Sequence, residues 1–205
     1  MLQAVKKYFH HAKYGPKIVV VSGLPRSGTS MMMNMLQAGG MQPVTDELRV
    51  ADVDNPKGYF EDERVKDLEH STDKAWIREA RGKVLKVISF LLKDLPEENA
   101  YQIIFMRRDL DEILASQNKM IAHRGASDST DDESIKELYR NDIARARVLA
   151  RRKPNVEMIE VKYRGTIEDP RETAAAVNAF LGGILDEQAM VNTVDASLYR
   201  NKRNG

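Results

Sequence analysis

Short apolar runs alternate along the chain with longer segments whose apolar residues recur every three or four positions. The runs rich in apolar and β-branched residues predict buried strands, at 18–21, 82–88, 101–106 and 157–163. The segments with helical spacing predict helices, at 31–38, 109–122, 133–152 and 170–181. Such alternation predicts an α/β protein with three layers, α/β/α, around a central parallel sheet. No internal repeat or linker interrupts it, so we expect a single domain over residues 1–205.

The most informative stretch lies between the first strand and the first helix and has the sequence Ser22-Gly23-Leu24-Pro25-Arg26-Ser27-Gly28-Thr29-Ser30. A strand, a glycine loop and a helix N-terminus in this order form an anion site, because backbone N–H groups and the helix dipole face the same point. Gly28 lets the backbone approach a ligand closely, and Arg26 can donate charge-assisted hydrogen bonds. The stretch therefore predicts a binding loop for a phosphate-like group.

The spacing of Gly23 and Gly28 matches the first part of the nucleotide-binding P-loop, which then continues with Lys and Ser or Thr. This chain has Thr29-Ser30 instead. The missing lysine normally reaches the terminal phosphates of ATP or GTP, so its absence argues against an NTPase or kinase. A P-loop kinase acting on a small molecule and a non-catalytic nucleotide-binding module remain as alternatives.

Composition narrows the possible classes of function further. The net charge of +1 gives no overall attraction for nucleic acid or for an anionic membrane. The chain has no cysteine, which excludes disulfides, thiolate metal sites and a cysteine nucleophile. No segment is apolar enough for a signal peptide or a membrane span, so we expect a cytoplasmic protein. No cluster of metal-ligating residues stands out, and we expect no metal.

The string from Pro25 to Ser30 resembles the 5′-phosphosulfate loop of the sulfotransferases that use 3′-phosphoadenosine 5′-phosphosulfate (PAPS). In these enzymes an arginine that ends a strand and a serine eight residues later hold the 3′-phosphate. Arg108 and Ser116 follow the strand predicted at 101–106 with this spacing. The resemblance implies a PAPS site in a P-loop sulfotransferase fold. Arg200, in the basic C-terminal tail, is a further candidate for this site. The implied cofactor-binding residues are Pro25, Arg26, Ser27, Gly28, Thr29, Ser30, Arg108, Ser116 and Arg200.

The resemblance also implies a reaction. A sulfuryl group would pass from PAPS to a hydroxyl or amine of a small-molecule, carbohydrate or lipid acceptor, releasing 3′-phosphoadenosine 5′-phosphate (PAP). Arg26 and the loop amides would stabilise charge on the leaving phosphate. Many members of the family have lysine where this chain has Arg26. Because arginine essentially cannot lose its proton, Arg26 would act electrostatically.

Two carboxylates are candidates for the base that takes the proton of the acceptor. In tyrosylprotein sulfotransferases a glutamate in a Glu-x-Arg element is the base, and Glu47 with Arg49 has a similar position after the loop, in a short strand predicted at 43–49. Glu61 ends a segment, 55–61, that is similar to one in small bacterial sulfotransferases. It could equally stabilise the start of a helix expected over 62–70. Lys83 and Lys86 are further candidates for reaching the cofactor or the acceptor.

Overall fold

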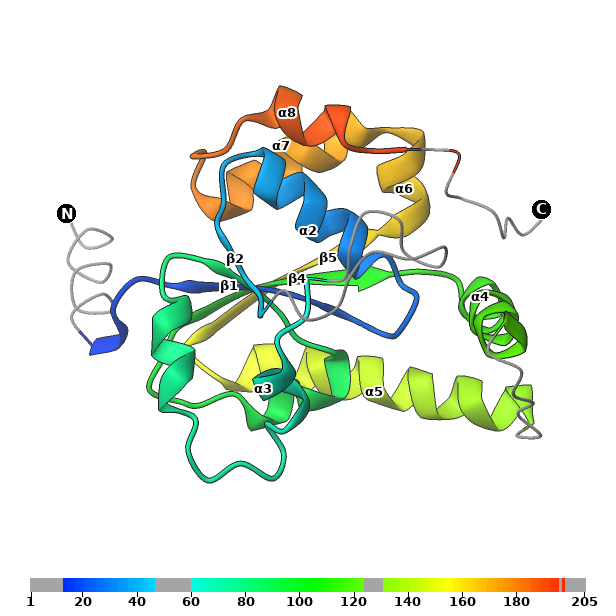
Figure 1. Ribbon diagram of the computed structural model, residues 1–205, viewed down its shortest axis with the longest axis horizontal. Coiled ribbons are helices and arrows are strands. Elements are labelled where there is room, and N and C mark those ends of the chain that lie inside the picture. Colours follow the sequence, from blue (N-terminus) through cyan, green and yellow to red (C-terminus); the bar gives the residue numbers. More distant parts are fainter. Residues whose placement is uncertain (1–12, 47–59, 124–130, 196, 198–205) are drawn as a thin grey trace.

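A wholly parallel five-stranded sheet, in the order β2-β3-β1-β4-β5, runs through the centre of the molecule (Figure 1). The computed structural model describes residues 13–46, 60–123, 131–195 and 197. The strands are β1 (Ile18–Gly23), β2 (Pro43–Val44), β3 (Val84–Lys86), β4 (Tyr101–Arg107) and β5 (Val156–Lys162). Parallel pairing in every neighbouring pair confirms the predicted sheet.

Helices cover both faces of the sheet (Figure 1). The α-helices are α2 (Thr29–Ala38), α3 (Glu63–Lys66), α4 (Leu110–His123), α5 (Asp132–Arg152), α6 (Tyr163–Glu168), α7 (Pro170–Leu181) and α8 (Glu187–Asn192). Two 3-10 helices are η1 (Ala75–Ala80) and η2 (Ser89–Asp94). Helices α2, α6, α7 and α8 lie on one face, and α3, α5, η1 and η2 lie on the other. This arrangement confirms the three layers.

Successive side chains of each strand point to opposite faces of the sheet, so the core has two parts, one on each face. Ile18 and Val20 of β1 face the layer of α5, whereas Val19 and Val21 face α2 and α7. All six residues of β1 are buried, as expected for a strand of a parallel sheet that is covered on both faces. The central position of β1 brings the loop that follows it to the middle of one sheet edge.

The methionines that follow the loop belong to this core. Met32, Met33 and Met35 of α2 have no exposed surface and pack with residues of α7 and α8. Flexible thioether side chains fill irregular space well. Their burial explains why this face of α2 is apolar without a cofactor.

Three predicted elements are shorter than expected, and one of them is the strand predicted over 82–88, which is only Val84–Lys86. In the described part of the strand predicted over 43–49, only Pro43–Val44 is a strand, because Thr45 and Asp46 bond to Glu61 and to the first residue of α3; residues 47–49 lie outside the described residues. Thr45 Oγ1 donates to the carbonyl oxygen of Glu61 at 3.0 Å, and the Glu63 amide donates to Asp46 Oδ2 at 2.7 Å. The helix expected over 62–70 is only α3, after which the chain continues in turns. Helix α6 was not predicted, and Tyr163, the last residue of the strand predicted over 157–163, begins this helix.

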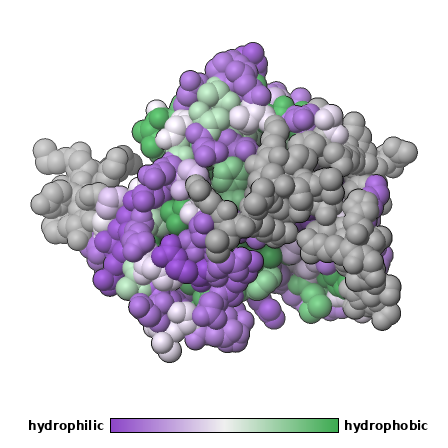
Figure 2. Space-filling view, in the orientation of Figure 1, coloured by the Kyte–Doolittle hydropathy of each residue, from purple (hydrophilic) through white to green (hydrophobic). Residues whose placement is uncertain are grey.

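The surface shown in Figure 2 is mostly hydrophilic over the described residues, with small separate hydrophobic areas. Large apolar side chains that are exposed are spread over different elements: Phe90, Leu138, Val148 and Ile184. In the part of the chain that the structure describes, every helix is too short or too polar to cross a lipid bilayer.

Replacing Ile103 with alanine is expected to lower the free energy of unfolding by about 2–5 kcal/mol, because it leaves a cavity in the core. Ile103 lies in the middle of β4 and has no exposed surface. Urea unfolding measures the effect. Ile184→Ala, at a side chain that is 72% exposed, is the matched control and should change stability by less than about 0.5 kcal/mol. Equal losses in the two variants would contradict the described core.

Candidate functional site

The glycine loop joins the end of β1 to the start of α2. Two of its residues have left-handed backbone conformations, Arg26 with φ 65° and Gly28 with φ 101°. The Ser27 amide closes the turn by donating to the carbonyl oxygen of Leu24 at 3.2 Å. The first turn of α2 contains no acidic residue, so no carboxylate of that turn offsets the positive end of the helix dipole. The loop therefore has the geometry and the charge of an anion site.

Glycine is required at two positions of this loop by close neighbours. A Cβ atom on Gly28 would lie 2.4 Å from Cδ2 of Tyr163. A Cβ atom on Gly23 would lie 2.5 Å from Ser27 Oγ and 2.7 Å from the carbonyl oxygen of Met106. Real Cβ atoms do not approach other atoms so closely, and the loop is thus packed directly against β4 and α6.

Two hydroxyls near the loop are buried without a hydrogen-bond partner. Ser22, near the end of β1, and Ser27, within the loop, have no exposed surface, and neither Oγ atom has a partner among the described residues. A buried polar group normally has a hydrogen-bond partner, because leaving it unpaired is costly. Unused hydrogen-bonding capacity at a cationic loop fits a ligand that carries phosphate-like oxygens.

The second half of the site lies where β4 leads into α4, at the same end of the sheet (Figure 1). Arg108 follows β4 directly, and Asp109 starts α4 by accepting hydrogen bonds from the amides of Asp111 and Glu112, at 2.9 and 3.3 Å. Ser116 lies two turns further along the helix and is buried. The carboxyl ends of β1 and β4 are neighbours, which brings this junction beside the loop.

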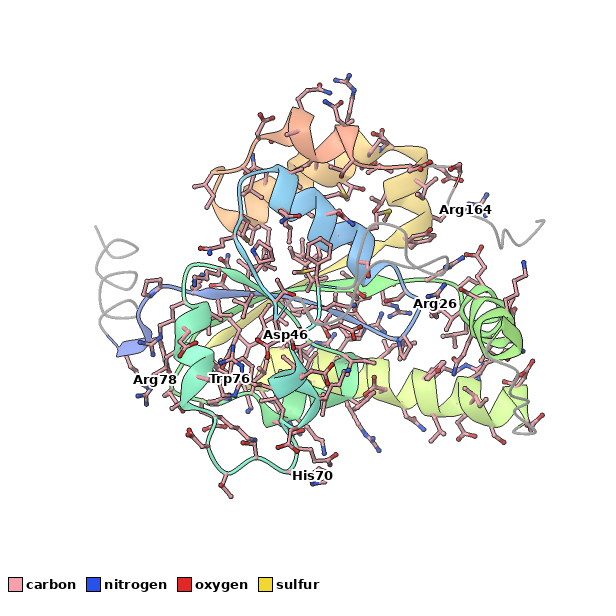
Figure 3. All side chains as sticks on the ribbon, in the orientation of Figure 1. Arg26, Asp46, His70, Trp76, Arg78 and Arg164 are labelled. Atoms are coloured by element: carbon pink, nitrogen blue, oxygen red, sulfur yellow. The ribbon has the colours of Figure 1, made fainter. Side chains whose placement is uncertain are left out.

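Reciprocal hydrogen bonds join the two halves. Arg26 Nε donates to Ser116 Oγ at 3.0 Å, and Arg108 Nη1 donates to the carbonyl oxygen of Arg26 at 3.1 Å. Figure 3 shows Arg26 on the loop beside α4. Residues 82 and 90 positions apart in the sequence thus lie side by side, and two arginines bring positive charge to this end of the sheet.

Arg108 is held on two further sides. Its Nε donates to Glu112 Oε2 at 3.0 Å, with side chains only 8% and 5% exposed, and its guanidinium lies 4.5 Å from the centre of the Tyr163 ring. Burial raises the pKa of Tyr163, so its hydroxyl stays protonated at neutral pH. Glu112 and Tyr163 were not among the predicted site residues. The position of Glu112 four residues after Arg108 was the available signal.

A third strand contributes an ion pair at this edge. Lys86 ends β3, pairs in register with Val21 of β1, and donates to Glu61 Oε1 at 3.2 Å. The two side chains are 15% and 22% exposed, and Lys66 approaches the other carboxylate oxygen of Glu61 at 3.9 Å. Lys83 lies at the opposite, amino end of β3. Of the two candidate lysines, only Lys86 is therefore at the loop end of the sheet.

The remaining predicted residues are placed as follows. Pro25, Thr29 and Ser30 lie in the loop and the first turn of α2 and are partly exposed. Glu47, the other candidate base, and Arg200 lie outside the described residues. Among those that are described, no group of three or more His, Asp or Glu side chains could hold a metal ion.

Solved structures with a similar fold include sulfotransferase STF1 from Mycobacterium tuberculosis H37Rv, at 14% identity and a TM-score of 0.56, covering 97% of this chain and 77% of that one. The sulfotransferase domain from the curacin biosynthetic pathway has 14% identity, a TM-score of 0.48 and coverage of 88% and 78%. Retinol dehydratase, in complex with androsterone and PAP, has 16% identity, a TM-score of 0.47 and coverage of 95% and 69%. The likeness to STF1 shows a shared α/β sulfotransferase fold.

The profile of the sulfotransferase family matches residues 69–187, which is more than half of the chain. The match includes Arg108 and Ser116 and begins after the glycine loop. No curated protein sequence matches the chain significantly. The chain belongs to the sulfotransferase family, and the protein is a transferase.

Proposed function

We propose that the protein transfers a sulfuryl group from PAPS to a hydroxyl or amine of a small-molecule, carbohydrate or lipid acceptor. The observation that carries this proposal is the pair of reciprocal hydrogen bonds between Arg26, Arg108 and Ser116. They join a loop suited to a 5′-phosphosulfate to an arginine and a serine suited to a 3′-phosphate. A nucleotide with anionic groups at both positions fits this pair of subsites better than ATP does.

We assign each residue of the site a proposed role in binding or in charge stabilisation. The loop amides with Ser27, Thr29 and Ser30 would hold the 5′-phosphosulfate, and Arg108 with Ser116 would hold the 3′-phosphate. Bound PAPS supplies the activated sulfuryl group. Arg26 and the positive end of the α2 dipole would stabilise the charge that develops on the leaving phosphate. This is catalysis by positioning and electrostatics.

Glu61 is the proposed base, with Lys86 as the cation that holds it. The capping side chain at the start of α3 is Asp62, which accepts from the Arg64 amide at 3.0 Å. Glu61 instead points its carboxylate at Lys86, on the loop end of β3. A carboxylate at this edge can take a proton from an acceptor that enters beside the phosphosulfate. Glu47 remains the other candidate.

Glu61→Gln is expected to lower turnover by about 10²-fold or more while PAP affinity changes less than about threefold, since the amide cannot accept the proton. Glu63→Gln is the matched control, because Glu63 is a half-exposed neighbour that pairs with Lys66. Steady-state transfer assays and calorimetric titration with PAP measure the two quantities. Normal turnover in Glu61→Gln, with loss in Glu47→Gln, would move the base to Glu47.

The proposed function is tested first by calorimetric titration of the purified protein with PAP, with ATP plus Mg²⁺ as the comparison. We expect tight binding of PAP that is lost in Arg108→Ala. Binding of ATP with Mg²⁺ but not of PAP would overturn the proposal in favour of a kinase. Binding of PAP that is followed by no transfer to any acceptor class, with carboxylate substitutions silent, would favour a non-catalytic nucleotide-binding module.

A further inference from the structure

We propose that Glu112 is a positioning residue that orients Arg108 for the 3′-phosphate of the nucleotide. The inference rests on the proposed use of PAPS. It concerns a side chain that is 5% exposed and whose carboxylate is directed at Arg108. Its partner, Arg108, is the residue expected to contact the phosphate.

The contacts of Arg108 determine its orientation. Glu112 accepts from Nε at 3.0 Å, and the carbonyl oxygen of Arg26 accepts from Nη1 at 3.1 Å. The Tyr163 ring lies 4.5 Å from the guanidinium. A planar group that is bonded at two of its nitrogens and stacked on a ring has a defined plane and direction. Removal of Glu112 would take away the contact at Nε and constrain the direction of the guanidinium less.

The location of this carboxylate argues for a role beyond helix stability. A negative charge beside a cation lowers the attraction of that cation for an anionic ligand, and burying a carboxylate is costly unless it is paired. An exposed pair at the same spacing, Arg164 Nε with Glu168 Oε1 at 2.7 Å, stabilises a helix without either penalty. A buried acid next to the phosphate-binding arginine is therefore explained by the geometry that it imposes.

The same contact reaches the loop. Arg108 donates to the carbonyl oxygen of Arg26, a residue with the unusual φ of 65°. The turn of the loop is closed separately by the Ser27 amide, which donates to the carbonyl oxygen of Leu24 at 3.2 Å, so we expect the 5′ subsite to keep its shape when Glu112 is replaced.

The experiment compares PAP with adenosine 5′-monophosphate, which lacks the 3′-phosphate, by calorimetric titration of the full chain. In Glu112→Ala, PAP affinity should fall about tenfold, corresponding to one charge-assisted hydrogen bond, while affinity for the monophosphate changes less than about threefold. Glu112→Gln, which keeps an acceptor oxygen for Nε, should restore most of the preference for PAP. Glu168→Ala is the matched control and should leave both affinities unchanged.

Glu112→Asp keeps the charge but shortens the reach, so it should also reduce the preference for PAP, and it decides the matter alone if the alanine variant does not fold. In an Arg108→Ala background, Glu112→Ala should cause no further loss of preference. Equal weakening of both nucleotides in Glu112→Ala or Glu112→Asp would overturn the inference and leave a structural role. A wild-type protein without preference for PAP would instead overturn the proposed function on which the inference rests.

Discussion

Arg26→Ala is expected to lower turnover by about 10²–10³-fold, the size of effect seen when one donor to a developing negative charge is removed. Arg26 is the only cationic residue within the glycine loop, and its side chain joins the loop to Ser116 at 3.0 Å. Its removal takes away positive charge and the hydrogen bond to Ser116 that joins the loop to α4. Both effects raise the free energy of the transition state more than that of the free enzyme.

The measurement is steady-state release of PAP with saturating acceptor. Arg26→Lys keeps the charge without the fork of donors and should fall between the wild type and the alanine variant. Arg107→Ala is the matched control, because Arg107 precedes Arg108 but pairs with Glu160 at 3.2 Å. Near-normal turnover in Arg26→Ala would rule out the proposed role of the loop.

Gly28→Ala is expected to lower PAP affinity by about tenfold or more and to destabilise the fold by about 1–3 kcal/mol. The residue has φ 101°, where a side chain is strained, and its new Cβ would lie 2.4 Å from Tyr163. Either the loop or the ring must move. Since Tyr163 also stacks on Arg108, movement of the ring would disturb both subsites.

Gly182→Ala separates the effect of backbone strain from the effect of the clash with Tyr163. Gly182 ends α7 with a similar φ of 98°, but a Cβ there meets nothing within 4 Å. It should therefore show the backbone strain, about 1 kcal/mol in urea unfolding, and leave PAP affinity unchanged. If Gly28→Ala binds PAP like the wild type while showing the same loss of stability as Gly182→Ala, the contact between loop and ring does not shape the site.

Sequence patterns predicted the strands best where burial is complete. The apolar runs of β1 and β4 are buried on both faces, so composition alone marks them. The strand predicted over 43–49 was wrong at Thr45 and Asp46, whose side chains bind Glu61 and the first residue of α3 instead, and its last three residues lie outside the described part of the chain. Polar side chains that compete for backbone groups are visible in the sequence, but their distant partners are not.

Some contacts of the candidate site could likewise be predicted from the sequence, and others could not. Arg26, Arg108 and Ser116 could be placed together because carboxyl ends of parallel strands meet at one edge. The pairing of Glu61 with Lys86 could not be predicted, because it depends on the path of the chain between β2 and α3. Glu112 was missed for another reason, since acid and base four residues apart usually form an exposed pair on a helix. Only burial distinguishes Arg108 with Glu112 from Arg164 with Glu168.

The strand order also has a consequence for how the chain folds. The first strand in the described part of the chain, β1, lies in the middle of the sheet, where Val19 pairs with Val84 and Ile18 pairs with Tyr101. During synthesis, β1 therefore emerges long before either of its neighbours. Its apolar side chains and its backbone hydrogen-bonding groups stay without their final partners until β3 and β4 have been made. Pairings between such distant segments slow folding and expose aggregation-prone surface in the meantime. The glycine loop packs against Met106 of β4 and Tyr163 of α6, so the contacts that surround it are complete only once these later segments have been made.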